Sequence, residues 1–190
     1  DYLTDRIEER RVAPTEDLIG RLVAAEGEGE LNQAEVLSAV NLLLLAGNET
    51  TTNLISNAVL ALATQPEKQA QLRERPDLIE PAVEEFLRYD GSVQYTSRTV
   101  TKPVSFHGQT VAAGEAVIVV LASANRDPWV FERPDELDFE RPRSPNKHIG
   151  FGDWIHICLG QFLARIETRA ALRALLGEFD DFELAIPADD

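Results

Sequence analysis

The spacing of apolar residues over the first half of the chain is typical of helices, and polar breaks separate one predicted helix from the next. Residues 1–12 form the first predicted helix. Thr15 to Asp17 cap a second short helix, and the glycine and glutamate residues at 26–30 form an acidic loop after it. Residues 1–31 are therefore expected to hold two short helices and this loop.

Asn32 caps the longest helix that the pattern predicts, over residues 32–64. At about 1.5 Å per residue such a helix is roughly 50 Å long. Leu42 to Leu45 are apolar on every face of it, which is typical of a helix that is buried on all sides. We therefore expect a long central helix that passes through the middle of the fold.

Two shorter helices follow, one after Pro66 and one that ends at Gly91. Residues 97–121 then contain short apolar runs with glycines between them, and they predict a small β region. Residues 125–160 are interpreted as a long coil and the loop around the only cysteine, and a last helix starts at about residue 159. The expected fold class is mainly α with a small β-sheet.

The net charge of the chain is −15 and its sequence pI is near 4.6. A surface this acidic repels phosphate backbones, so we expect no nucleic-acid partner. No apolar run is long enough to cross a bilayer, so we expect no membrane insertion. The single cysteine excludes an internal disulfide and is typical of the reducing cytoplasm. The chain starts at Asp1 and contains no methionine, which indicates a fragment of a longer protein.

Cys158 lies in the segment HIGFGDWIHICLG, residues 148–160, where glycines mark a tight loop that leads into the last helix. A helix amino terminus and the amide donors of such a loop favour a thiolate. One thiolate cannot complete a zinc site, but it can be the single axial ligand of a haem iron. The other interpretation is a buried cysteine that acts as a small hydrophobic residue. The loop alone leaves both interpretations open.

The polar stretch AGNETT, Ala46 to Thr51, follows the apolar centre of the long helix. Gly47 and Glu49 are costly inside a buried helix. The Thr50 hydroxyl can bond a carbonyl one turn back and open the helix locally. The resulting groove would hold a hydroxyl and a carboxyl that can relay protons. The alternative is a polar break that faces solvent.

Glu85 and Arg88 lie three residues apart in the segment EFLR, on one face of a predicted helix, and can form an ion pair. Such pairs are common, and at a surface they are individually weak. A buried pair would also attract Arg126, from the segment NRDP, into a network of three residues.

Taken in sequence order, these motifs closely resemble the cytochrome P450 superfamily, and most of all its soluble bacterial members. The motifs are AGNETT, EFLR, a strand with Ser97-Arg98, NRDPWVFERPDELDFERPR, and HIGFG followed by HICLG. The resemblance covers essentially all of residues 1–190, but only the carboxy-terminal half of the family's usual length. It implies one partial domain with the carboxy-terminal part of the cytochrome P450 fold, including the long central helix and the haem-thiolate loop.

The resemblance also implies roles for residues around the cofactor. Cys158 would be the axial thiolate of haem b, and Phe151 would pack on the macrocycle near the sulfur. Arg98, His148 and His156 match positions that bind the haem propionates, and their N–H groups suit carboxylates.

The catalytic pair implied by the resemblance is Thr50 and Glu49, which would steer protons to dioxygen. Ala46 and Gly47 would leave room for oxygen and substrate. The structural set that braces the coil under the haem would be Glu85, Arg88 and Arg126.

The implied reaction inserts one oxygen atom of dioxygen into a small organic substrate and releases the other as water. Electrons would come from NAD(P)H through a reductase and a ferredoxin or similar redox partner, in the cytoplasm. Arg165, Arg169 and Arg173 lie at i, i+4 and i+8 of the last helix. They form either a docking patch for an acidic redox partner or a face with internal salt bridges.

Trp154 departs from the family pattern FGxGxHxCxG, which has a glycine at this place. If the backbone there has a positive φ, a tryptophan is strained by on the order of 1–3 kcal/mol. This departure and the missing half favour a rival interpretation: a truncated, catalytically silent binding or scaffold protein without stable haem. The rival is contradicted by four retained features: Cys158, the Glu49-Thr50 pair, the Glu85/Arg88 pair and Arg98.

Overall fold

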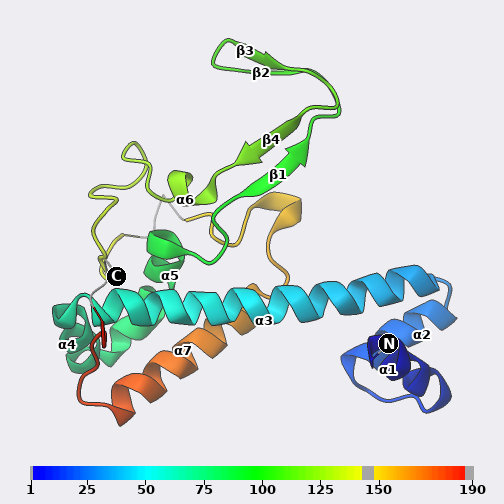
Figure 1. The fold of residues 1–190 in the computed structure, drawn as a ribbon, viewed down its shortest axis with the longest axis horizontal. Coiled ribbons are helices and arrows are strands. Elements are labelled where there is room, and N and C mark those ends of the chain that lie inside the picture. Colours follow the sequence, from blue (N-terminus) through cyan, green and yellow to red (C-terminus); the bar gives the residue numbers. More distant parts are fainter. Residues whose placement is uncertain (1, 143–147, 187–190) are drawn as a thin grey trace. The chain divides into compact units, whose positions relative to one another are not determined.

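The structure is a computed structural model that describes residues 2–142 and 148–186. Its helices and 3₁₀ turns are α1 (Tyr2–Val12), α2 (Leu18–Gly27), α3 (Gln33–Ala63), α4 (Pro66–Glu74), η1 (Pro76–Leu78), α5 (Ile79–Asp90), α6 (Leu121–Ala124), η2 (Trp154–His156) and α7 (Gln161–Glu178) (Figure 1). Its strands are β1 (Thr96–Thr99), β2 (Val104–Phe106), β3 (Gln109–Val111) and β4 (Ala116–Val119). The fold is mainly helical, as predicted. None of the described helices is long and apolar enough to span a membrane.

The contacts divide the chain into two compact units, Asp1–Glu49 and Thr50–Asp190, where we expected one partial domain. The division falls within α3, whose first part belongs to one unit and whose second part belongs to the other. Residues 143–147 of the predicted 125–160 segment lie outside the described residues.

The first unit has a small core of its own, in which Ile7 packs with Val36 and Val40. A reciprocal cap starts α3. The side-chain oxygen of Asn32 accepts hydrogen bonds from the amides of Ala34 and Glu35, and the Glu35 carboxylate accepts one from the Asn32 amide. This cap explains why α3 begins within one residue of its predicted start.

The apolar centre of α3 is exposed rather than buried on all sides, which corrects the prediction. The exposed fractions of Leu42, Leu44 and Leu45 are 65%, 59% and 65%. A helix that is apolar on every face needs neighbours on every side, and the described residues do not cover these leucines. The helix also runs without interruption through Ala46 to Thr50, so the predicted local opening is not seen.

The core of the second unit is built from the last part of α3 together with α4, α5 and α7 (Figure 1). Leu54 and Leu62 of α3 pack with Val83 and Phe86 of α5 and with Leu172 of α7. Phe86 also makes an edge-to-face contact with Phe139 of the coil after α6, at 5.4 Å between ring centroids. Helix α5 is therefore enclosed, which fixes it as the element against which the coil is placed.

The strands form two separate two-stranded antiparallel sheets instead of one small sheet. In the first, β1 pairs with β4, so that Arg98 lies opposite Val117. In the second, β2 and β3 form a hairpin with a turn at His107-Gly108, where both residues have positive φ. The hairpin is short and mostly exposed, so it adds little to the core.

Candidate functional site

A buried ion pair lies at the centre of the second unit. Glu85 and Arg88 of α5 have side-chain exposures of 4% and 2%, and two guanidinium nitrogens of Arg88 donate to the two carboxylate oxygens of Glu85 at 2.9 and 2.8 Å. The remaining Arg88 donors bind carbonyls of the coil, at Asn125, Pro134 and Glu136. The predicted pair is present, and it connects α5 to a coil some forty to fifty positions away in sequence.

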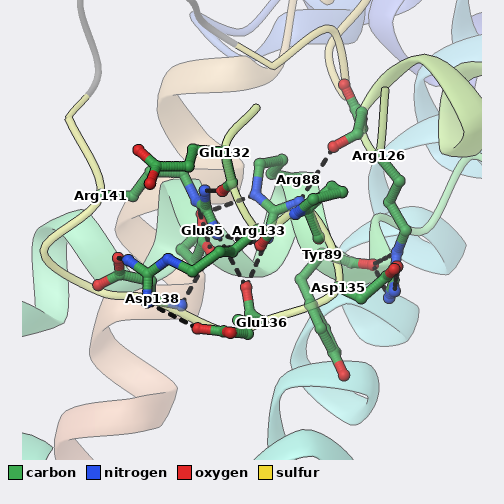
Figure 2. A network of polar contacts seen from close by, with 12 residues as sticks. Glu85, Arg88, Tyr89, Arg126, Glu132, Arg133, Asp135, Glu136, Asp138 and Arg141 are labelled. Carbon is green, nitrogen blue, oxygen red and sulfur yellow. Dashed lines mark hydrogen bonds and ion pairs between the residues drawn. The ribbon is translucent and has the colours of Figure 1, made fainter. Parts of the chain in front are cut away.

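Arg141 is the third member of this network (Figure 2). Its Nε lies 3.1 and 3.2 Å from the two carboxylate oxygens of Glu85, and the Asp138 amide donates to the same carboxylate at 2.9 Å. The other Arg141 donors bind coil carbonyls, at Glu132, Arg133 and Glu136. One carboxylate therefore balances two guanidinium groups, and the guanidinium groups hold the coil by its backbone.

The prediction that Arg126 joins Glu85 was wrong. Arg126 binds the carbonyl of Tyr89 at 2.7 and 3.1 Å, pairs with Asp135 at 3.0 Å, and stacks over the Tyr89 ring. It lies one residue after Asn125, whose carbonyl takes an Arg88 donor, so it reaches the end of α5 rather than its middle. Arg141 was present in the quoted segment FERPR, but spacing alone did not distinguish it from Arg126.

The coil leads directly to the cysteine loop. The side-chain oxygen of Asn125 accepts a hydrogen bond from the Ile149 amide at 2.8 Å. Asn125 is almost fully buried, so this bond is a fixed point between the network and the loop. A Cβ at Gly150 would lie 2.9 Å from the Leu87 carbonyl oxygen, so only glycine fits where the loop touches α5.

The loop itself is closed by backbone hydrogen bonds. The amide of Cys158 donates to the carbonyl of Phe151 at 2.8 Å, and the amide of Gly152 donates to that of Ile149 at 2.8 Å. Gly152 has a φ of +73°, which glycine adopts without strain. The thiol of Cys158 is half-buried and not in a disulfide, and the residue lies three positions before the start of α7.

Trp154 has a φ of +54°, so the position occupied by glycine in the family pattern does have a left-handed backbone. Tryptophan is bulky and strained in this conformation. Its side chain is 85% exposed, and the neighbouring Ile155 is 81% exposed. The ring therefore points into solvent in this structure instead of filling the loop.

The two histidines of the segment have different surroundings. Both ring nitrogens of His148 are used by the protein: Nε2 lies 3.1 Å from the Glu84 carboxylate, and Nδ1 accepts from the Gly150 amide at 3.1 Å. This arrangement differs from the propionate contact expected of His148. His156, at the end of η2, is exposed and keeps its ring available.

Arg98 extends from β1 into solvent. It donates to the Thr96 hydroxyl at 3.0 Å and to the Ser97 carbonyl at 2.8 Å, both neutral acceptors on its own strand. No acidic partner of Arg98 occurs within residues 2–142 and 148–186. Its charge is therefore available to an acidic ligand.

The residues of the AGNETT stretch lie on α3. Thr50 is half-buried, Thr51 is buried and Glu49 is exposed. A Cβ at Gly47 would meet no atom within 4 Å, so Gly47 borders open space. Ala46, Gly47 and Glu49 belong to the first unit and Thr50 to the second.

The side chains around Cys158 fit a flat, apolar group with acidic edges. Ile157 and Leu159 flank the cysteine, Phe162 follows on the first turn of α7, and all three are exposed. In the part of the chain that the structure describes, no three His, Cys, Asp or Glu residues gather to hold a metal ion. A loop with one free cysteine, beside apolar side chains and with the exposed Arg98 on the same unit, fits the donor set of the haem-thiolate proteins.

The comparisons with known proteins agree with this class. The family model described as Cytochrome P450 matches residues 1–185. The biotin biosynthesis cytochrome P450 of Bacillus subtilis is 43% identical over 97% of this chain and 46% of its own length. The vitamin D(3) 25-hydroxylase of Pseudonocardia autotrophica is 43% identical over 100% of this chain and 47% of its own length.

Among solved structures, the tirandamycin C-bound P450 monooxygenase TamI superposes with a TM-score of 0.95 at 38% identity, over 100% of this chain and 48% of that one. The chain belongs to the cytochrome P450 family, whose members bind haem through a cysteine thiolate. It spans about half the length of the curated relatives that it matches.

Proposed function

We propose that this chain is the haem-binding, carboxy-terminal part of a monooxygenase that inserts one oxygen atom of dioxygen into a small organic substrate and releases the other as water. The observation that carries the proposal is the continuous set of contacts from the buried Glu85 network to the cysteine loop. Arg88 holds the carbonyl of Asn125, Asn125 holds the amide of Ile149, and the Phe151 carbonyl holds the amide of Cys158.

In this proposal the sulfur of Cys158 would hold haem b through its iron. When bound, the haem supplies the iron at which dioxygen is reduced. The loop fixes the backbone of Cys158 through the carbonyl of Phe151. Arg98 and His156 would donate N–H groups to the haem carboxylates, because both face solvent and no acid among the described residues pairs with Arg98.

Proton delivery is assigned to Thr50 and Glu49. The exposed Glu49 carboxyl takes protons from solvent, and the hydroxyl of the half-buried Thr50 passes them on. Ala46 and Gly47 carry little or no side chain, so oxygen and substrate have room beside this part of α3.

Electrons are assigned to NAD(P)H through a reductase and a ferredoxin or similar partner, with the protein in the cytoplasm. The arginine stripe of α7 is not the surface that we assign to this partner. Arg165 pairs with Glu84 at 2.6 Å and Arg169 lies 3.6 Å from Glu80, which favours the internally paired interpretation.

The test is a carbon monoxide difference spectrum of the reduced chain after reconstitution with haem, followed by turnover with NAD(P)H, reductase and ferredoxin. We expect the Soret band of a thiolate-ligated haem, and we expect Cys158→Ser to lose this band while it keeps its circular dichroism spectrum. A Cys158→Ser chain with the same band as the unmodified one would overturn the assignment of the ligand.

A second candidate function is a catalytically silent binding protein without stable haem. Two observations favour it: the positive φ of Trp154, and the exposure of Leu42, Leu44 and Leu45 on α3. Haem titration separates the two candidates. A chain that takes up no haem, with or without Trp154→Gly, fits the silent protein and contradicts the monooxygenase.

A further inference from the structure

Glu84 lies beside Glu85 on α5, and it makes a second set of contacts that the buried network does not use. Its carboxylate accepts from Nε and Nη2 of Arg165 at 2.6 and 3.0 Å, and it lies 3.1 Å from Nε2 of His148. The three side chains have exposures of 19%, 26% and 10% for Glu84, Arg165 and His148. This is a largely desolvated, bidentate ion pair with an imidazole on the same carboxylate.

The two partners of Glu84 lie on opposite sides of the cysteine. His148 stands at the entry to the loop, and Arg165 stands on the first turns of α7, at the exit from it. Arg165 also donates to the carbonyl and the side-chain oxygen of Gln161, the first residue of α7. A single carboxylate on α5 therefore holds both ends of the loop.

The contacts continue from both partners to Phe151. The guanidinium of Arg165 lies over the Phe151 ring at 4.5 Å, and the ring of His148 lies 6.2 Å from it between centroids. The carbonyl of Phe151 is the acceptor for the Cys158 amide. Phe151 therefore contacts both partners of Glu84 through its ring and the cysteine backbone through its carbonyl.

The hydrogen bonds of His148 give its ring one orientation. Nδ1 accepts from the Gly150 amide and therefore carries no proton, so the proton is on Nε2 and is donated to Glu84. Burial raises the pKa of Glu84, but the hydrogen bonds from His148 and Arg165 outweigh it and hold the pKa at about 2. The acceptor thus stays charged at neutral pH, which favours both donors.

We propose that Glu84 is a positioning residue for the haem ligand: with His148 and Arg165 it holds the two ends of the cysteine loop to α5, and through Phe151 it sets the backbone position and accessibility of Cys158. This inference rests on the proposed role of Cys158 as ligand. It assigns to two adjacent glutamates two separate tasks, with Glu85 holding the coil before the loop and Glu84 holding the loop.

The first experiment needs no haem. Cys158 is the only cysteine of the chain, so the rate at which a thiol reagent labels the protein reports on this loop alone. We expect Glu84→Gln and Arg165→Lys to raise the labelling rate at least about tenfold, because charged hydrogen bonds that close the loop are lost. Glu80→Gln is the matched control, since Glu80 is on the same helix and its contact with Arg169 is long and exposed, and it should change the rate less than about twofold.

Local opening must be distinguished from global unfolding. Labelling through local opening hardly depends on low concentrations of urea, whereas labelling through global unfolding accelerates steeply with urea. We expect the faster labelling of Glu84→Gln to be independent of urea, and we expect the double variant Glu84→Gln/Arg165→Lys to label no faster than the faster single variant. Equal rates in Glu84→Gln and the unmodified chain, or an increase that occurs only through global unfolding, would overturn the proposal.

The second experiment uses the haem-loaded chain. We expect Glu84→Gln to move part of the carbon monoxide spectrum from the thiolate position to that of a neutral ligand, and Glu84→Asp to restore part of the thiolate band. If the unmodified chain shows no thiolate band, the proposed function fails while the labelling result still stands by itself. If the unmodified chain shows the band and Glu84→Gln leaves it unchanged, the positioning role fails and the proposed function stands.

Discussion

The carboxylate of Glu85 and the guanidinium of Arg141 are 56 positions apart in sequence and meet at 3.1 Å in the interior. Arg88 binds the same carboxylate from three residues away, so one negative charge balances two positive ones. The geometry explains how a coil without regular secondary structure is held against α5. Its carbonyls satisfy the arginine donors that the carboxylate does not.

We predict that Glu85→Gln is strongly destabilising, because it leaves two buried guanidinium groups without a counter-charge. The free energy of unfolding should fall by about 3–5 kcal/mol. Urea denaturation followed by circular dichroism measures this loss. Asp77→Asn, which affects only an exposed ion pair with Arg75, is the control and should leave the urea midpoint unchanged. A loss in Glu85→Gln as small as that of the control would contradict the account of the network.

Arg141→Lys and Arg126→Lys test which arginine belongs to the network. Lysine keeps the charge but cannot bind Glu85 and the coil carbonyls at once, so Arg141→Lys should lower the melting temperature clearly. Arg126 contacts Tyr89 and an exposed aspartate, so its replacement should have the smaller effect. Differential scanning calorimetry of both variants gives the two decreases in melting temperature. A larger decrease in Arg126→Lys than in Arg141→Lys would show that Arg126 contributes more to stability.

Trp154→Gly should stabilise the loop, because glycine adopts a positive φ without strain. The relief of strain exceeds the entropy cost of a glycine, for a net gain of about 1 kcal/mol. The ratio of bound haem to protein should rise with it. Ile155→Gly replaces an equally exposed neighbour whose backbone is not left-handed, and it should lower stability. Unchanged haem occupancy in Trp154→Gly would show that the loop tolerates tryptophan.

Acid should weaken the fold through Glu84 in a defined range. The pKa of Glu84 is lowered from 4.5 to about 2 in the folded chain, so its stabilising contribution is complete above 4.5 and is lost as the pH falls towards 2. The full loss is on the order of 3 kcal/mol. Urea midpoints recorded across this range should fall less steeply in Glu84→Gln than in the unmodified chain. Parallel pH profiles would contradict the assignment.

Arg98→Gln should weaken haem binding without a change in the stability of the haem-free chain. The side chain of Arg98 is exposed, and among the described residues it bonds two neutral groups of its own strand, so little of the fold depends on it. A haem titration and a thermal melt of the haem-free protein, done side by side, separate the two effects. Equal haem affinity would remove Arg98 from the propionate site.

The local elements were predictable from the sequence because their signals are local. Asn32 and its reciprocal cap mark the start of α3, and Pro66 starts α4. The comparison of Trp154 with a glycine pattern pointed to this position as one where a left-handed backbone would cause strain, and the backbone there is left-handed. Pairing between distant segments was not predictable in the same way. Nothing in the spacing of residues distinguishes Arg141 from Arg126 as the partner of Glu85, since the choice depends on the path of the coil.

The burial of side chains and the contacts of the histidines could not be predicted from the local sequence either. Leu42 to Leu45 looked like an enclosed segment, but exposure depends on which other segments are present to cover it. His148 has the sequence position of a loop histidine, and only the geometry shows that Glu84 and Gly150 use both of its ring nitrogens. The signal for Glu84 itself was that a glutamate directly precedes Glu85, which the spacing of Glu85 and Arg88 does not take into account.

The adjacency of Glu84 and Glu85 has a consequence for how the sequence can vary in length. Successive side chains of a helix point about 100° apart. Glu84 and Glu85, on one turn of α5, can therefore contact two different segments, the cysteine loop and the coil before it. A single inserted or deleted residue between Glu85 and Arg88 would rotate one end of α5 against the other by that angle. This rotation would separate Arg88 from Glu85 while Glu84 still faced the loop. No single substitution elsewhere would restore the direction of Arg88 relative to Glu85. The length of α5 between Glu85 and Arg88 is therefore constrained as strictly as the identity of these two residues.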